Sequence, residues 1–246
     1  MVHKLAIVAV IGLSASAVCI GAAAAIGGRE LRKELEGMDL AGLSSFGGKP
    51  RCERVTGSPN RDLEWDGSES ISLAVPAHAR YSPTNGKMVH VSGNPQAVAH
   101  VRVRDGRVEM DCSGNWRFED SDLQITLPGG EFRKFGILGA GKLTLEKLDQ
   151  RKLKVSIAGS GSIKAEGRVA HTEIHIAGSG DADLGRVQSH IAMVHIAGSG
   201  NTDIAPSEEA DIHIAGSGDV NLHTSPKNVE THIAGSGRIR NVGDGG

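Results

Sequence analysis

The stretch Ile174-His175-Ile176-Ala177-Gly178-Ser179-Gly180-Asp181 contains the pattern that decides the fold. Its central string, Ile-Ala-Gly-Ser-Gly, occurs five times, at intervals of 19, 20, 18 and 19 residues. The copies begin at Ile157, Ile176, Ile196, Ile214 and Ile233, and a degenerate copy runs from Ile137 to Gly141. A period near 20 residues predicts a solenoid in which each repeat forms one coil.

Residues on either side of each Gly-Ser-Gly alternate between apolar and polar side chains. Alternation with a period of two is typical of strands with one buried face. The glycines permit a bend in which two backbones approach closely. The predicted turn glycines are Gly159, Gly161, Gly178, Gly180, Gly198, Gly200, Gly216, Gly218, Gly235 and Gly237. The sequence therefore predicts an all-β protein ending in a parallel β-helix of about six coils over residues 133–246.

Two other solenoid types fit the repeat less well. A left-handed hexapeptide helix needs coil lengths that are multiples of six, and a calcium-binding nonapeptide roll needs Gly-x-Gly-x-Asp. Here Gly178-Ser179-Gly180 places Ala182 at the ligand position, and each coil has one glycine turn instead of two. We therefore expect a right-handed β-helix without obligatory calcium.

The composition limits the function classes. The chain has 246 residues, of which 39% are hydrophobic and 23% charged, with a formal net charge of −2. These values suit one or two folded cores and give no support for disorder or for nucleic-acid binding. Phosphate-binding glycine loops, the nucleophile elbow and the helical zinc-protease motif are missing from the sequence, so no cofactor is expected.

The N-terminus predicts export. Lys4 precedes an apolar run that ends in Ala22 to Ala25, which is the pattern of a secretory signal peptide over residues 1–25. The alternative is an uncleaved anchor, because Leu5 to Ile26 is long enough to cross a bilayer. Residues 26–50 are then a tether or a short helix.

A composition change separates a first β region from the repeats. All seven aromatic residues and six of the eight prolines precede residue 136. Within residues 51–132, segments 70–75 and 122–127 alternate as strands, and Asp105-Gly106 lies between two further runs as in a hairpin. We expect an antiparallel β head that caps the first coil and protects its edge.

Two cysteines remain after removal of a signal peptide. Cys52 and Cys112 would form a disulfide in an oxidising compartment and close a loop of about 60 residues. The alternative is two buried thiols. Neither cysteine has the neighbouring residues of a catalytic nucleophile.

The exported β-rich head, followed by Leu127-Pro128, the Ile137 to Gly141 copy and repeated Ile-Ala-Gly-Ser-Gly-Asp units, resembles a bacterial family. This is the putative auto-transporter adhesin family with the head GIN domain, a domain of unknown function. The resemblance covers roughly residues 50–242. It implies a β-helix-like fold in the bacterial envelope and offers no catalytic residues.

A histidine precedes the repeat isoleucine in four coils: His175, His195, His213 and His232. Equivalent positions of stacked coils lie about 4.8 Å apart, and these side chains point outward. Such a column could bind a transition metal through neutral imidazoles. The plainer interpretation, which we favour, is a ladder of polar side chains repeated by duplication, with self-repulsion and lower stability below about pH 6.

A second outward column follows the glycine turns and comprises Asp181, Asp183, Asn201, Asp203, Asp219 and Asn221. Paired carboxylates carry out glycoside hydrolysis in many enzymes. However, every coil carries a similar pair, whereas an active site needs unequal environments to separate two pKa values. We therefore interpret the column as a solubilising face.

Taken together, the sequence predicts a non-catalytic structural or binding module of the bacterial periplasm or cell surface. Its partner would be an envelope protein or a glycan, with membrane contact only through the N-terminal segment if that segment is uncleaved. The alternatives are a carbohydrate-active β-helix enzyme and a metal-binding periplasmic protein that uses the histidine column.

Overall fold

The computed structural model describes residues 51–55, 57–113 and 122–243. The predicted signal peptide or anchor, residues 1–25, and the predicted tether, residues 26–50, lie outside the described residues.

The described chain is almost entirely β-structure, with one short helix, α4 (Pro95–His100), among the described residues. The strands are β1 (Asn60–Glu64), β2 (Ser70–Ala74), β3 (His78–Tyr81), β4 (Met88–Ser92), β5 (Val101–Arg104), β6 (Arg107–Met110), β7 (Gln124–Thr126), β8 (Lys134–Gly139), β9 (Lys142–Gly159), β10 (Ser162–Gly178), β11 (Asp181–Gly198), β12 (Thr202–Gly216), β13 (Asp219–Leu222), β14 (Asn228–Gly235) and β15 (Arg238–Asn241).

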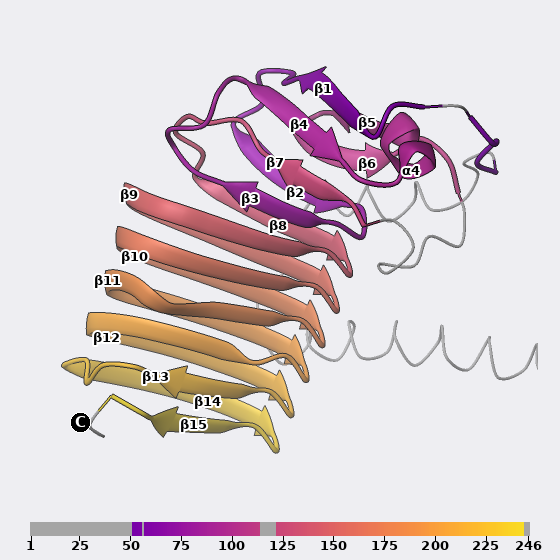
Figure 1. Ribbon diagram of the computed structural model, residues 1–246. Coiled ribbons are helices and arrows are strands. Elements are labelled where there is room, and N and C mark those ends of the chain that lie inside the picture. The colour runs from indigo at the N-terminus through magenta and orange to yellow at the C-terminus, as the bar shows by residue number, and fades with distance from the viewer. Residues whose placement is uncertain (1–50, 56, 114–121, 244–246) are drawn as a thin grey trace, which may run out of the picture. The chain divides into compact units, whose positions relative to one another are not determined.

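The repeats form the predicted parallel solenoid, of about six turns with a period of about 19 residues. Strands β9 to β12 stack in parallel, β13 and β14 both pair with β12, and β15 pairs with β13 at the end of the stack (Figure 1). The repeat isoleucines are paired along the stack, as in Ile176↔Ile196 and Ile196↔Ile214. Burial alternates along each strand, so the aliphatic side chains point inward as the period of two predicted.

Successive coils approach each other so closely at each corner that the position requires glycine. Gly198 has a φ of +135°, a conformation that side-chain-bearing residues rarely adopt. A Cβ atom at Gly198 would lie 2.1 Å from the carbonyl oxygen of Gly178 in the preceding coil. That oxygen accepts a hydrogen bond of 2.9 Å from the backbone N–H of Ser199. Each corner is therefore locked to the corner before it by a contact that leaves no space for a side chain.

The opposite side of the coils is less regular. The pairing of β10 with β9 shifts between Ala165 and Gly167, and that of β11 with β12 shifts between Asp183 and Gln188. The strand segments that lead into and out of each glycine corner stay in register on both sides of these shifts. The variation of the repeat interval between 18 and 20 residues is therefore absorbed away from the glycine corner.

The first part of the described chain contains the predicted hairpin, in which β5 and β6 pair antiparallel and the turn residues Asp105 and Gly106 both have positive φ. The antiparallel pairs β1 with β4 and β4 with β7 are also there. In addition, β2 pairs in parallel with both β8 and β6, and β3 with both β9 and β7. Segments of the head therefore extend the solenoid beyond its first repeat, in an order that differs from chain order (Figure 1).

A single hydrophobic cluster runs from Ile71 in β2 to Leu222 in β13. At the end of the cluster that lies in the head, Tyr81 packs against Phe132 and Phe135, with ring centroids 5.9 Å and 4.8 Å apart. Core and backbone pairing thus both continue from the head into the repeats. No helix within residues 51–55, 57–113 and 122–243 has the length and hydropathy needed to span a membrane.

Candidate functional site

The four repeat histidines form a continuous outward ladder. Successive ring centroids of His175, His195, His213 and His232 lie 5.0, 4.9 and 4.8 Å apart. The angles between successive ring planes are only 4°, 10° and 10°. The strand register causes this arrangement, because each histidine occupies the position paired with the next.

A second outward column lies two residues before the ladder and makes its members unequal. It contains Lys154, Glu173, Met193, Asp211 and Glu230, which are paired from strand to strand. We call these residues the companion column. Sequence reasoning missed it, although the spacing of two residues before each histidine was a visible signal, because its residue types differ from coil to coil.

At the first end of the ladder, the companion column holds a compensated charge cluster. The Glu173 carboxylate lies 2.5 Å from Nε2 of His175 and 2.6 Å from Nζ of Lys154. The hydrogen bond from His175 is the main cause that lowers the pKa of Glu173 to about 2, and Lys154 adds to it. At neutral pH the Glu173 carboxylate is therefore ionised and bound by both His175 and Lys154.

His195 is in a different environment in the middle of the ladder. It lies between two other imidazoles, and the companion column offers it Met193 instead of a carboxylate. Its Nδ1 atom is buried and has no hydrogen-bond partner within the described part of the chain. Burial, with smaller contributions from His175 and His213, lowers the pKa of His195 to about 4.

We expect this depressed pKa to make the protein less stable in mild acid. The unfolded chain binds a proton at His195 below about pH 6.5, whereas the folded chain does so only near pH 4, so acidification favours unfolding across this window. The expected loss between pH 7 and pH 4 is roughly 2–3 kcal/mol, with allowance for solvent screening. Chemical denaturation at several pH values measures it.

The matched variants are His195→Gln and His190→Gln, since His190 is exposed outside the ladder. His195→Gln should flatten the dependence of unfolding free energy on pH between 6.5 and 4, and His190→Gln should leave it as in the wild type. Equal pH slopes for the wild type and His195→Gln would refute the assignment. Glu173 contributes its full stabilisation above about pH 4.5 and loses it as the pH falls towards 2, so it affects a lower pH window than His195 does.

At the last end of the ladder, Asp211 accompanies His213 and His232. Oδ1 of Asp211 lies 2.9 Å from Nε2 of His213. One ligand atom from each of Asp211, His213 and His232 can be chosen so that all three lie within 4.8 Å of one another. The structure therefore brings two of the predicted histidines together with a carboxylate that the sequence analysis did not include.

The Asp and Asn column after the glycine corner forms polar ladders across the coils. Oδ1 of Asp181 accepts hydrogen bonds of 3.0 and 3.1 Å from the backbone and side-chain nitrogens of Asn201. Further along, Oδ1 of Asn201 accepts from the backbone N–H of Asp219 at 3.2 Å. Asp219 in turn lies 3.1 Å from a guanidinium nitrogen of Arg240.

The neighbouring ladder, two residues further along each coil, has the same character. Nζ of Lys164 donates to Asp183 at 2.7 Å. Asp203 lies 2.8 Å from Nε2 of His223 and accepts from Nδ2 of Asn221 at 3.2 Å. Each carboxylate of the column thus has an amide or cationic partner, which makes the face less acidic than the sequence alone indicated.

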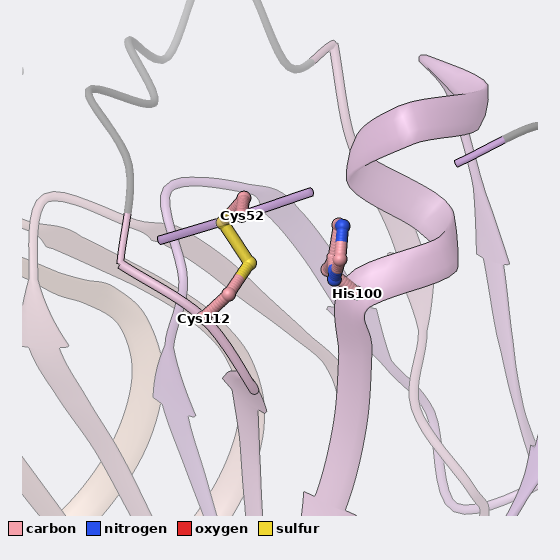
Figure 2. A group of neighbouring side chains, drawn as sticks. All are labelled: Cys52, His100 and Cys112. Carbon is pink, nitrogen blue, oxygen red and sulfur yellow. A yellow bond between two sulfur atoms is a disulfide. The ribbon is translucent and has the colours of Figure 1, made fainter. Parts of the chain in front are cut away.

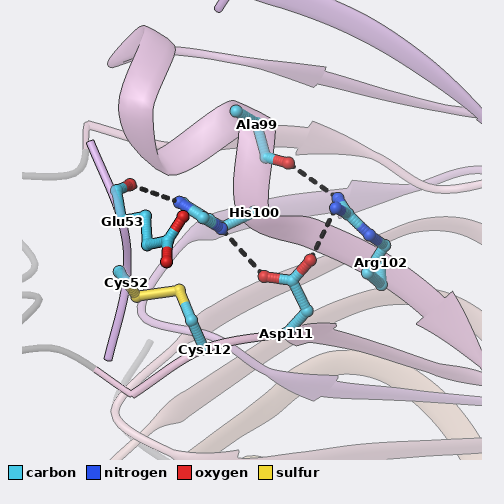
Figure 3. Close-up of a disulfide and its surroundings, with 7 residues drawn as sticks. All are labelled: Cys52, Glu53, Ala99, His100, Arg102, Asp111 and Cys112. Carbon is cyan, nitrogen blue, oxygen red and sulfur yellow. Dashed lines mark hydrogen bonds and ion pairs between the residues drawn. A yellow bond between two sulfur atoms is a disulfide. The ribbon is translucent and has the colours of Figure 1, made fainter. Parts of the chain in front are cut away.

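The structure joins Cys52 and Cys112 by a disulfide, with their Cα atoms 4.9 Å apart (Figure 2). His100 lies beside it, and ligand atoms of these three residues are within 4.8 Å of one another. Both ring nitrogens of His100 have partners, since Nδ1 lies 2.9 Å from Asp111 and Nε2 lies 3.0 Å from the carbonyl oxygen of Glu53 (Figure 3). The donors of this cluster are already used, so it is a structural cross-link in the oxidised protein.

Figure 3 also shows how the cross-link is held in place. Asp111 pairs with Arg102 at 2.5 Å, and Arg102 donates to the carbonyl oxygen of Ala99 at 2.7 Å, near the end of α4. These contacts connect α4, the β5–β6 hairpin and the segment around Cys52.

Comparison with known proteins places this geometry in a family. Residues 69–226 match the family model described as "Putative auto-transporter adhesin, head GIN domain". The chain belongs to this head GIN domain family. The match covers β2 of the head, which pairs in parallel with β8 in this chain, and most of the repeats.

Solved structures are similar to this head GIN domain chain at low sequence identity. A structure titled a putative adhesin from Bacteroides fragilis is 20% identical, with a TM-score of 0.56, and the alignment covers 74% of this chain and 96% of that one. One titled a putative lipid binding protein from Parabacteroides distasonis is 19% identical, with a TM-score of 0.49, over 77% of this chain and 100% of that one. No protein with a curated description matches the sequence significantly.

Proposed function

We propose that this head GIN domain protein is an exported, non-catalytic binding module of the bacterial cell envelope, which engages a glycan or protein through the outward faces of its solenoid. The observation that carries the proposal is the in-register stacking of polar side chains on those faces, from β9 to β15. A surface that repeats the same chemistry at each coil suits a ligand that is itself extended. The adhesin description of the family and of the Bacteroides fragilis structure supports a surface role.

Binding to isolated envelope material tests this function. We expect the purified protein to bind a total envelope fraction saturably, and its fractionation in cells to follow the periplasm or cell surface. Two charge-neutral double variants probe the two faces: Lys164→Ala with Asp183→Ala on the Asp–Asn ladder, and Lys154→Ala with Glu173→Ala beside the histidines. At least one should weaken binding by about tenfold, which is 1.4 kcal/mol.

Asp149→Ala with Arg151→Ala is the matched control, because both side chains are exposed on β9 and belong to neither ladder. This control should bind as the wild type does. Binding that is absent, or that all three variants retain in full, would contradict a role for the ladder faces.

The same material tests the carbohydrate-active alternative. That alternative rests on the carboxylates Asp183 and Asp203, which are paired in the strand register. We expect no new reducing ends after incubation with envelope glycans. Release of reducing ends that Asp203→Asn abolishes would replace the binding function by glycoside hydrolysis.

A further inference from the structure

The last two coils bring together two imidazoles and a carboxylate that the rest of the ladder does not match. We propose that Asp211, His213 and His232 form a binding site for one divalent transition-metal ion, with Zn²⁺ as the best-fitting ion. The site lies on the histidine face, which is one of the two ligand faces proposed above. It needs only three side chains at one end of the histidine ladder, so it does not depend on the binding of an envelope ligand.

Strand register sets the geometry. Asp211 and His213 project outward from β12, and His232 projects from the paired position of β14. The rings of His213 and His232 are 4.8 Å apart and almost parallel, at 10°. One ligand atom from each of the three residues falls within 4.8 Å of the other two, so modest side-chain rotations can direct them at a common point.

Asp211 supplies the strongest reason to place the ion here. Its Oδ1 atom is buried and makes no hydrogen bond within residues 51–55, 57–113 and 122–243, although Nε2 of His213 lies 2.9 Å away. A buried carboxylate oxygen without a hydrogen bond is costly. The equivalent carboxylate of Glu173 is already bound by His175 and Lys154. Only Asp211 thus combines an unsatisfied oxygen with two adjacent imidazoles in this ladder.

The charges around Asp211 favour a cation. The positions paired with Asp211 on the neighbouring strands are Met193 and Glu230, and the outward residue two positions before it is Glu209. The next pairs of this face are Ile191 with Glu209 and Glu209 with Asn228. None of these positions carries a lysine or arginine, so no side-chain cation of the two columns competes with the metal. Lys154 lies at the far end, beside Glu173.

The donor set selects the class of metal. Imidazole nitrogens with one carboxylate suit zinc and its neighbours in the first transition row, whereas calcium and magnesium prefer oxygen ligands alone. Zinc–nitrogen bonds are about 2.0–2.1 Å long, so the two rings must tilt towards one another to share an ion. His232 can do so because it is exposed on β14. The small exposed side chains Ala215 and Ala234, two residues after these histidines, leave the remaining coordination positions open to water.

Calorimetric titration with Zn²⁺ tests the site on the protein purified without a polyhistidine tag and freed of metal. We expect one Zn²⁺ per chain at pH 7.5. His232→Gln and Asp211→Asn should each weaken binding by at least about tenfold. His175→Gln is the matched control, because it removes an imidazole from the other end of the same ladder, and it should leave the affinity within about twofold.

Two further measurements check that each variant is folded and that His232 binds the metal directly. The thermal midpoints of the metal-free variants show whether each is folded, and Co²⁺ in place of Zn²⁺ should give a visible absorption band that His232→Gln removes. No binding by the wild type overturns the proposal. Equal losses in His175→Gln and His232→Gln also overturn it, since they would show diffuse binding along the ladder instead of a site at Asp211.

Discussion

Replacing Gly198 by alanine is expected to destabilise the protein by about 4 kcal/mol, the sum of two costs. The φ of +135° at Gly198 is nearly exclusive to glycine and costs a side-chain-bearing residue about 1–3 kcal/mol. The new Cβ atom would also lie 2.1 Å from the carbonyl oxygen of Gly178, and displacing well-packed neighbours costs about 1–3 kcal/mol. For a chain of this size the thermal midpoint should fall by about 10 °C, measurable by calorimetry or circular dichroism.

Two other glycines separate these costs. Gly139 occupies the same corner in the degenerate repeat, with a φ of +110° and open space around its Cβ position. Gly139→Ala therefore measures the conformational cost alone, about 2 kcal/mol. Gly86 also has open space and is exposed, so Gly86→Ala should change the stability by less than about 0.5 kcal/mol. If Gly198→Ala and Gly139→Ala have the same midpoint, the close approach between coils is not what requires glycine.

The corner shows why the solenoid could be predicted from sequence. A backbone conformation and a close contact that only glycine allows recur in every coil, so the same residues recur in the sequence at a nearly fixed spacing. The outward ladder of histidines followed from the same regularity, because parallel in-register strands place equal positions side by side. The surroundings of each histidine could not be predicted in the same way. They depend on which residue of the companion column lies beside the histidine, such as Met193 at one coil and Asp211 at another.

The head was harder to predict for a related reason. Strands β2 and β3 pair in parallel with β8 and β9, yet the corner between them is Val75-Pro76-Ala77 and carries no Gly-Ser-Gly. Local alternation identified β2 as a strand but contains no information about its partner. The local turn signal Asp105-Gly106 did specify its own hairpin, and the structure has it. The sequence therefore did not predict the pairing of strands that are far apart in the chain and carry no repeated string.

Removal of the disulfide is expected to cost about 4 kcal/mol of unfolding free energy. Cys52 and Cys112 are 60 residues apart, and freeing a loop of this length raises the chain entropy of the unfolded state by an amount worth about 4 kcal/mol. The loop contains β1 to β6, including the strand β2 that stacks directly on β8. Guanidinium unfolding of the double variant Cys52→Ala with Cys112→Ala measures the effect as a lower midpoint, with a somewhat steeper slope because the unfolded chain without the cross-link exposes more surface.

Reduction of the wild type separates the cross-link from the lost packing of the thiol groups. Cys112 is only 7% exposed, so the double variant also loses a few core contacts that the reduced wild type keeps. A thiol reductant should therefore lower the wild-type midpoint by nearly as much as the double substitution, and it should leave the double variant unchanged. If the oxidised and reduced wild type unfold at the same guanidinium concentration, the cross-link does not stabilise the head. The contacts of Asp111 with His100 and Arg102 would then suffice to hold that region together.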